Sequence, residues 1–308
     1  MHRLQDKGRS IGKGPRHLIS APQQHVNIDL HIHTDASDGS YSPFEILAFA
    51  RNRRLGAISF TDHDSIDGVK AYKQCPGSDD VDVLPGVEIT AQAPPEVNLS
   101  ESLHILGYGI QIDSPELEQL LSILQKARDE RTPRIIRRLE RLGMELTYEE
   151  LTAAFSGPQL GRPHIAQLMV HKGYVSTIDE AFDRYLGTGK PAYVDKYRVS
   201  YHQAARAIHH AGGVVVLAHP GLYHLWDEQL DFLIRRLKEG GLRGIEIYYP
   251  EHSKTQTACY ERLSKKYALL ATGGTDFHGA ATPGIEIGEG RGNFHVPYEL
   301  YEKLLQAL

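Results

Sequence analysis

Two histidines one residue apart are the first residues of this chain whose types and spacing could do chemistry. His31 and His33 lie in the stretch N-I-D-L-H-I-H-T, which starts at Asn27 and has the apolar alternation of a β-strand. Alternate residues of a strand point to the same face, so both imidazoles would project to one side. Neutral imidazole nitrogens placed in this way can bind a metal ion. Polar residues on an exposed strand face have the same spacing. The histidine pair therefore indicates a metal site only if the chain offers further ligands.

Further candidate ligands lie at or near the ends of other predicted strands. Glu88 comes toward the end of V-D-V-L-P-G-V-E-I-T, and His219 ends V-V-V-L-A-H. In a parallel α/β barrel the carboxyl ends of the strands meet at one face, where such folds place their active sites. Together with Asp38 from the loop after the first strand, the candidates are His31, His33, Asp38, His63, Glu88, His104, His219, Asp276 and His278.

These imidazoles and carboxylates are too many for a single four-coordinate ion. About two or three ions of the manganese, iron or zinc kind would suit them, since mixed nitrogen and oxygen donors serve all three metals. Ions held in this way lower the pKa of a bound water from about 15.7 toward about 7 and offset charge on phosphate oxygens. A single histidine such as His104 in an apolar strand is more often a hydrogen-bonded core residue. Candidate ligands occur, however, at the ends of many predicted strands. This arrangement favours a metal site that hydrolyses phosphate esters, with Glu88 as the bridging carboxylate.

Strands alternate with helices in both halves of the chain, which predicts a mainly parallel sheet with helices outside it. Residues 42–45, S-P-F-E, have the serine, proline and glutamate that start a helix. From Ser114 to about Tyr193 the pattern is helical and rich in charge, and Thr132-Pro133 predicts an interruption or kink of a long helix. We expect a tail over residues 1–24, a barrel over residues 25–112 and 194–308, and a helical insertion over residues 113–193 that caps the barrel mouth.

The composition argues against several classes of protein. The 308 residues have a formal net charge of −5, which does not suit a surface that coats duplex DNA. Two cysteines, Cys75 and Cys259, are too few for a disulfide framework. No run reaches the roughly 18 to 20 apolar residues of a membrane span, and the basic residues 1–24 have no apolar segment suited to a secretory signal. We therefore expect a cytoplasmic protein without a membrane partner and a disordered tail, for which a nucleic-acid-contacting arm is the alternative.

Six motifs between about residues 26 and 280 carry a family resemblance. They are D-L-H-I-H-T-D-A-S-D-G, F-T-D-H-D, G-V-E-I-T, H-I-L-G-Y, L-A-H-P and G-G-T-D-F-H-G, in this order. In kind and order they resemble the motifs of the PHP (polymerase and histidinol phosphatase) superfamily. The resemblance implies a distorted (β/α)7 barrel that binds two or three divalent ions, manganese in the first place and iron or zinc otherwise. Matching positions imply three ligand groups: His31, His33, Glu88 and Asp276; Asp38, His63 and His219; Glu88, His104 and His278.

The helical insertion resembles that of a narrower group. Residues 128–131, R-D-E-R, the later G-R-P-H that ends at His164, and P-A-Y at residues 191–193 are similar to the nucleoside 3′,5′-bisphosphate phosphatases, whose relatives include a 5′-to-3′ exoribonuclease. The resemblance implies that the insertion holds the part of the nucleotide distant from the hydrolysed phosphate. A solvated charged face is the alternative and is favoured for Arg134, Arg137, Arg138 and Arg141. The substrate-binding candidates are Arg128, Asp129, Glu130, Arg131 and His164.

We therefore expect a metal-dependent phosphatase that converts nucleoside 3′,5′-bisphosphates into nucleoside 5′-monophosphates and phosphate. Glu88, His219 and Asp276 are the expected catalytic residues. A 5′-to-3′ exoribonuclease on short RNA is the alternative that would use the same site. Another small phosphomonoesterase, of the histidinol phosphatase kind, and a non-catalytic metal-binding module are further alternatives. The expected partner is a small nucleotide or a short RNA, and the sequence has no signal for an oligomeric state.

Overall fold

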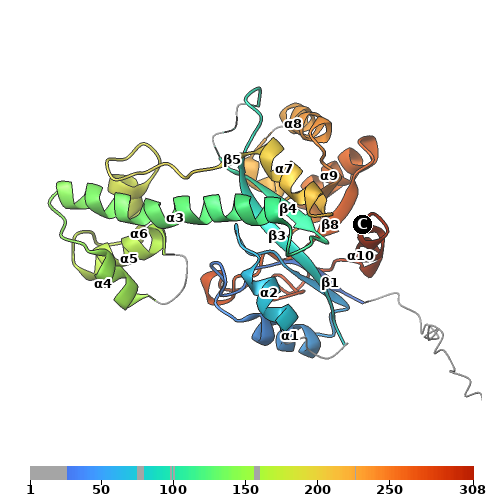
Figure 1. The fold of residues 1–308 in the computed structure, drawn as a ribbon, viewed down its shortest axis with the longest axis horizontal. Helices are drawn as coiled ribbons and strands as arrows, with labels where there is room; N and C mark the ends of the chain where they lie inside the picture. Colours follow the sequence, from blue (N-terminus) through green and yellow to red (C-terminus); the bar gives the residue numbers. More distant parts are fainter. Residues whose placement is uncertain (1–25, 75–79, 98, 100, 156–159, 226) are drawn as a thin grey trace, which may run out of the picture.

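The computed structural model describes residues 26–74, 80–97, 99, 101–155, 160–225 and 227–308. The expected tail over residues 1–24 and Cys75 lie outside these described residues. Within them, no helix is both long and apolar enough to cross a membrane. Figure 1 shows a sheet surrounded by helices on one side of the molecule and a helical lobe on the other, joined by one long helix.

An eight-stranded sheet forms the centre of the protein, and its strands come from both ends of the sequence. Ile32 forms a parallel bridge with Phe277, which follows the last strand, so the two edges of the sheet approach each other. The fold is a distorted α/β barrel, as expected. Its strands, in their order across the sheet, are β1 (Ile28–Ile32), β2 (Ala57–Phe60), β3 (Asp82–Gln92), β4 (Leu103–Tyr108), β6 (Val214–Leu217), β7 (Gly244–Tyr248) and β8 (Leu270–Gly273), with β5 (Val199–Ser200) beside β3.

Strand β4 runs in the opposite direction to its neighbours. It pairs antiparallel with both β3 and β6, whereas the other neighbouring pairs are parallel. We expected the carboxyl ends of all strands to lie at the barrel mouth, and this expectation is wrong for β4. A parallel pair needs a crossover of a dozen or more residues, and residues 93–102 are too few for one. His104 consequently reaches the common mouth from the amino end of its strand, opposite Thr90 of β3.

Helices pack around the sheet and alternate with its strands, as the sequence predicted in general. The first begins as expected, because the Ser42 side chain accepts from the Glu45 main chain while the Glu45 carboxylate accepts from the Ser42 main chain. Strands such as β6 are buried along their whole length, which fits a sheet covered on both faces. The surrounding elements are α1 (Pro43–Asn52), α2 (Asp67–Gln74), α7 (Tyr201–His210), η2 (Pro220–Tyr223), α8 (Asp227–Glu239), α9 (Lys254–Lys266), η3 (Gly279–Ala281) and α10 (Tyr298–Leu305). Of these, α10 and the short turns η2 and η3 were not predicted.

The helical lobe has a hydrophobic core of its own and shares one helix with the barrel (Figure 1). The first half of α3 packs in the barrel core through residues such as Leu117 and Leu124, and the second half packs in the lobe through Ile135 and Leu139. The two cores therefore meet within α3. The lobe contains α3 (Pro115–Arg141), α4 (Tyr148–Ala154), α5 (Arg162–His171), α6 (Ile178–Ala181) and the π-helical turn η1 (Phe182–Leu186).

Helix α3 is 27 residues long and continues past Pro133. Of the interruption or kink expected at Thr132-Pro133, the interruption is therefore wrong. A proline inside a helix costs about 3 kcal/mol or more, because one hydrogen bond is lost and the ring meets the preceding turn. Burying an isoleucine or leucine contributes about 1.5–3 kcal/mol, and Ile135, Ile136 and Leu139 are all buried just beyond the proline. Packing therefore outweighs the local preference. As one continuous helix, α3 runs from the barrel core into the core of the lobe.

Candidate metal centre and substrate cleft

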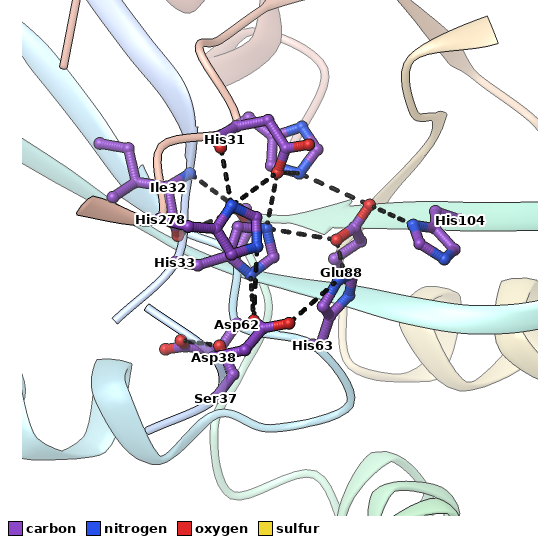
Figure 2. A network of polar contacts seen from close by, with 12 residues as sticks. His31, Ile32, His33, Ser37, Asp38, Asp62, His63, Glu88, His104 and His278 are labelled. Carbon is purple, nitrogen blue, oxygen red and sulfur yellow. Dashed lines mark hydrogen bonds and ion pairs between the residues drawn. The ribbon is translucent and has the colours of Figure 1, made fainter. Parts of the chain in front are cut away.

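Glu88 lies at the centre of the barrel mouth and is fully buried on β3 (Figure 2). Its carboxylate oxygens lie 2.8 to 3.5 Å from ring nitrogens of His31, His33, His63, His104 and His219. Burial by itself would raise the pKa of Glu88, but the surrounding imidazoles, His63 and His104 foremost, hold that pKa well below its usual range. Glu88 is therefore placed as the shared acceptor of the site, the position that a bridging carboxylate would occupy.

The first group of candidate ligands has the membership that the resemblance implied. His31, His33, Glu88 and Asp276 each offer one ligand atom, and these atoms lie within 4.8 Å of one another. Asp276 Oδ1 is 3.3 Å from His31 Nε2 and 3.0 Å from His33 Nε2. The four donors come from β1, β3 and the loop after β8, so the barrel brings together residues that are far apart in the sequence.

Two histidines exchange places relative to the groups that the resemblance implied. The structure groups His278 with His33, Asp38 and His63, and its Nε2 is 3.4 Å from Asp38 Oδ1. His219 instead lies beside His104, with ring centroids 5.1 Å apart, and 3.0 Å from Glu88. Strand order is the reason. His219 follows β6, the neighbour of β4, whereas His278 follows β8, which meets β1 and its His33.

Several donor atoms at this mouth are buried and have no hydrogen-bond partner among the residues that the structure describes. They include His31 Nε2, His33 Nε2 and Asp276 Oδ1. Buried polar atoms are normally paired, and each unpaired one costs about 1–3 kcal/mol. Imidazole nitrogens and carboxylate oxygens that converge on one point are the donors that divalent transition ions prefer. The donor set of this chain therefore fits divalent metal ions.

The electrostatics of the mouth favour positive charge at some histidines and not at others. Burial would lower the pKa of His33, yet Asp276 and Glu88 raise it to about 10. Burial lowers the pKa of His104 to about 4 in spite of Glu88. The region between Asp276 and Glu88 thus attracts cations, and protons and metal ions would compete for it.

Three buried aspartates outside the candidate set hold the main chain beside the candidate ligands. Each accepts a hydrogen bond from the main-chain N–H and another from the hydroxyl of one threonine, over 2.5 to 3.0 Å. The threonines lie within two residues of His33, Glu88 and Asp276, so these bonds restrain the ligands themselves. The pairs are Asp29 with Thr275, Asp62 with Thr34, and Asp64 with Thr90.

A cleft of about 1190 Å³ separates the groups of candidate ligands from the helical lobe. Asp38, His63 and His278 line it on the barrel side, and Arg131 and His164 line it on the lobe side. A molecule in this cleft would touch candidate metal ligands at one end and cationic side chains at the other.

The structure brings three of the five predicted substrate residues to this cleft. Arg128, Arg131 and His164 line it, whereas Asp129 and Glu130 are exposed and do not. Residues three apart on a helix share a face, and the two between them point elsewhere. The resemblance implied that all four residues of the R-D-E-R motif bind substrate. Helix geometry places only the two arginines at the cleft.

Two arginines of the lobe make the far end of the cleft electropositive. Arg131 donates through Nε to the Val194 carbonyl over 2.9 Å, but its Nη2 is buried and finds no hydrogen-bond partner in the described part of the chain. Burial and the nearby Arg162 lower the pKa of Arg131 to about 10. The guanidinium carbons of both arginines lie over the Tyr193 ring, at 5.9 and 5.5 Å from its centroid. An anion at this end would relieve the repulsion between the two and satisfy the buried N–H group.

Sequence reasoning missed three residues that the structure places at the site. Lys196 lines the cleft and donates to Thr90 Oγ1 over 2.9 Å, although its loop has no motif that would have revealed it. Arg162 lies in the G-R-P-H stretch, in which only His164 was expected to bind substrate. Glu246 is fully buried on β7 and contacts His31, and the acidic residue in G-I-E-I-Y was a visible signal.

Known proteins are similar to this chain over most of its length. A family model described as the PHP domain matches residues 29–212. The 5′-3′ exoribonuclease Rnm of Escherichia coli (strain K12) is 31% identical over 265 residues, 85% of this chain and 88% of that protein. The 3′,5′-nucleoside bisphosphate phosphatase of Chromobacterium violaceum is 30% identical over 264 residues, 85% of this chain and 91% of that protein. A solved structure of a C. violaceum amidohydrolase with bound sulfate and no metal has a TM-score of 0.75 and 29% identity, and the match covers 92% of this chain and 97% of that one.

Proposed function

This chain belongs to the PHP domain family and is a metal-dependent phosphoester hydrolase, and we propose that it removes the 3′-phosphate from nucleoside 3′,5′-bisphosphates. The observation that carries the proposal is the two-ended cleft, with candidate metal ligands at one end and Arg131 and Arg162 at the other, and with Lys196 beside Thr90 toward the metal end. A substrate with one phosphate to hydrolyse and a second phosphate to bind would satisfy both ends. The similar C. violaceum protein carries the name of this activity.

The side chains divide the work between binding and chemistry. Divalent ions, manganese in this proposal and iron or zinc otherwise, would supply the Lewis acid and the activated water that phosphate hydrolysis needs. Guanidinium groups bind phosphate oxygens in a bidentate way, so Arg131 and Arg162 would hold the 5′-phosphate. In hydrolysis the water oxygen bonds to phosphorus, the bond from phosphorus to O3′ breaks, and O3′ takes a proton. The candidate ligands are His31, His33, Glu88 and Asp276 for one ion, His33, Asp38, His63 and His278 for a second, and His63, Glu88 and His104 with His219 beside them for a third.

A panel of substrates tests the proposal with the manganese-loaded protein. We expect kcat/KM for adenosine 3′,5′-bisphosphate to exceed that for adenosine 3′-monophosphate by about 10- to 150-fold, since a hydrogen bond to a charged group contributes about 1.5–3 kcal/mol. Histidinol phosphate is the comparison from a different substrate class. Equal or faster turnover of histidinol phosphate would contradict the proposal and favour the histidinol phosphatase alternative.

The size of the cleft favours a second candidate, a 5′-to-3′ exoribonuclease on short RNA. Pockets for small molecules usually measure about 300–1,000 Å³, and this cleft is larger at about 1190 Å³. The similar protein of E. coli is named as such a nuclease. A 5′-phosphorylated trinucleotide separates the two candidates: release of mononucleotides at a rate that rivals bisphosphate turnover would favour the nuclease, and slow release would favour the phosphatase.

Lys196 should make substrate binding depend on pH. Burial lowers the pKa of this lysine to about 8, so its ammonium carries a charge below pH 8 and loses it above. We therefore expect KM for the bisphosphate to rise as the pH passes about 8 in the unchanged protein. In Lys196→Arg this rise should move to higher pH, because a guanidinium stays charged. KM measured from pH 6 to 9.5 checks the prediction, and an unchanged pH profile in Lys196→Arg would exclude Lys196 as its source.

A further inference from the structure

Glu246 is a fully buried carboxylate on β7 that lies outside the set of nine candidate ligands. Its two oxygens contact two candidate ligands that come from different strands. Oε1 is 2.9 Å from Nδ1 of His31, and Oε2 accepts from the main-chain N–H of His219 over 2.7 Å. The buried Asp29, Asp62 and Asp64 accept bonds from threonines, and Asp29 also accepts from the main-chain N–H of His31 over 3.3 Å, but in the described part of the chain none of the three is hydrogen-bonded to the ring of a candidate ligand.

We propose that Glu246 is a positioning residue that fixes the ring of His31 and the main chain of His219 for metal binding. The inference concerns the metal centre and does not depend on which phosphate ester is the substrate.

The contact with His31 determines which ring nitrogen is available. An ionised carboxylate accepts hydrogen bonds and cannot donate them, so a neutral, metal-binding His31 would carry its proton on Nδ1. Nε2 then has a lone pair, and this nitrogen faces Asp276 Oδ1 at 3.3 Å and Glu88 Oε1 at 3.5 Å. A carboxylate behind a metal-binding histidine commonly orients the ring and raises its basicity in this way.

The contact with His219 holds an unusual main-chain conformation. His219 has φ 24° and ψ 61°, a left-handed conformation that residues other than glycine rarely adopt, and it precedes Pro220, which restricts it further. The hydrogen bond from its N–H to Glu246 stabilises this conformation. The side chain is thereby directed at Glu88, with Nε2 of His219 3.0 Å from Glu88 Oε1. Without the acceptor, we expect the main chain to relax and the ring to leave this position.

Replacement of Glu246 by glutamine distinguishes the effect of its two hydrogen bonds from the effect of the volume that its side chain fills. Glu246→Gln keeps the shape of the side chain, but an amide has one acceptor oxygen and an NH₂ group that only donates. It can therefore accept from His31 or from His219, but not from both. The matched control is Thr272→Val, because Thr272 is buried and lies opposite Glu246 in the register of β7 and β8.

The experiment measures Mn²⁺ binding to the metal-free full-length protein by titration calorimetry, with no substrate present. We expect Glu246→Gln to weaken at least one Mn²⁺ site by about 10- to 100-fold, the usual effect of removing such a partner. Thr272→Val should change Mn²⁺ affinity by less than about twofold, even if its unfolding temperature falls. Nitrogen chemical shifts of the histidine rings, measured with Zn²⁺ in place of the paramagnetic Mn²⁺, should show the Nδ1–H form of His31 in the unchanged protein and a loss of that preference in Glu246→Gln.

Mn²⁺ affinity and histidine shifts that stay the same in Glu246→Gln would overturn the inference, as would equal losses of affinity in Glu246→Gln and Thr272→Val. If Glu246→Gln does not fold, Glu246→Asp takes its place, since the shorter carboxylate keeps the charge but cannot reach both partners. Because no substrate enters these measurements, failure of the inference is distinguishable from failure of the proposed phosphatase activity.

Discussion

Glu88→Gln should reduce hydrolysis by on the order of 1,000-fold, which corresponds to a loss of about 4 kcal/mol of transition-state stabilisation. Glu88 is the carboxylate that approaches five imidazoles, and it belongs to two of the three candidate ligand groups. Glutamine has nearly the same volume but no negative charge to offset two cations. The variant should therefore bind fewer Mn²⁺ ions while it keeps its fold.

Turnover of the bisphosphate and the Mn²⁺ content of the purified protein measure this effect. Glu118→Gln is the control, because Glu118 is an exposed carboxylate that pairs with Lys70 on the surface, away from the mouth. Circular dichroism of both variants checks the fold. Full activity of Glu88→Gln, or an undiminished metal content, would contradict the role of Glu88 as a bridging ligand.

Arg131→Met should raise KM for the bisphosphate by about 10- to 150-fold and leave turnover of 4-nitrophenyl phosphate nearly unchanged. The side chain of Arg131 is half-buried and has an unpartnered N–H group, so an incoming phosphate gains a charge-assisted hydrogen bond that methionine cannot make. 4-Nitrophenyl phosphate has a single phosphate, which goes to the metal end, and does not need this contact.

Arg134→Met is the matched control for Arg131→Met. Arg134 lies on the same helix one turn further along but is exposed, so its removal should change KM by less than about twofold. Steady-state kinetics with both substrates separate the outcomes. An equal loss for both substrates in Arg131→Met would indicate damage to the metal end, and no loss for either would remove Arg131 from the phosphate site.

Both predictions treat the protein as two halves that meet at one cleft. In the proposed function the barrel half supplies the chemistry, and the lobe half selects the substrate. Arg128 connects them, since it extends from α3 to an ion pair with Asp64, which in turn holds Thr90 near Glu88. This contact joins the lobe to the barrel beside the candidate ligands, and under the proposed function the distance between the two ends of the cleft would select substrates by length.

Local patterns in the sequence determined the candidate ligands, the alternation of strands and helices, and the helix that begins at Ser42. Each depends on residues a few positions apart, such as the spacing of His31 and His33 on one strand face. The same patterns could not determine the direction of β4, the continuation of α3 through Pro133, or the exchange of His219 and His278.

Those features depend on which strands become neighbours and on how much apolar surface is buried, and both involve residues that are far apart in the chain. His219 and His278 each follow a strand, but only the order β4-β6 and the meeting of β8 with β1 decide which carboxylate each faces. Glu246 is the clearest case. An acidic residue inside a buried strand was a visible signal, but the sequence could not name its partners, because His31 and His219 are 215 and 27 residues away. The sequence by itself thus determined which residues could bind metal, and the tertiary structure decided how they are grouped and oriented and which cationic residues of the lobe face them across the cleft.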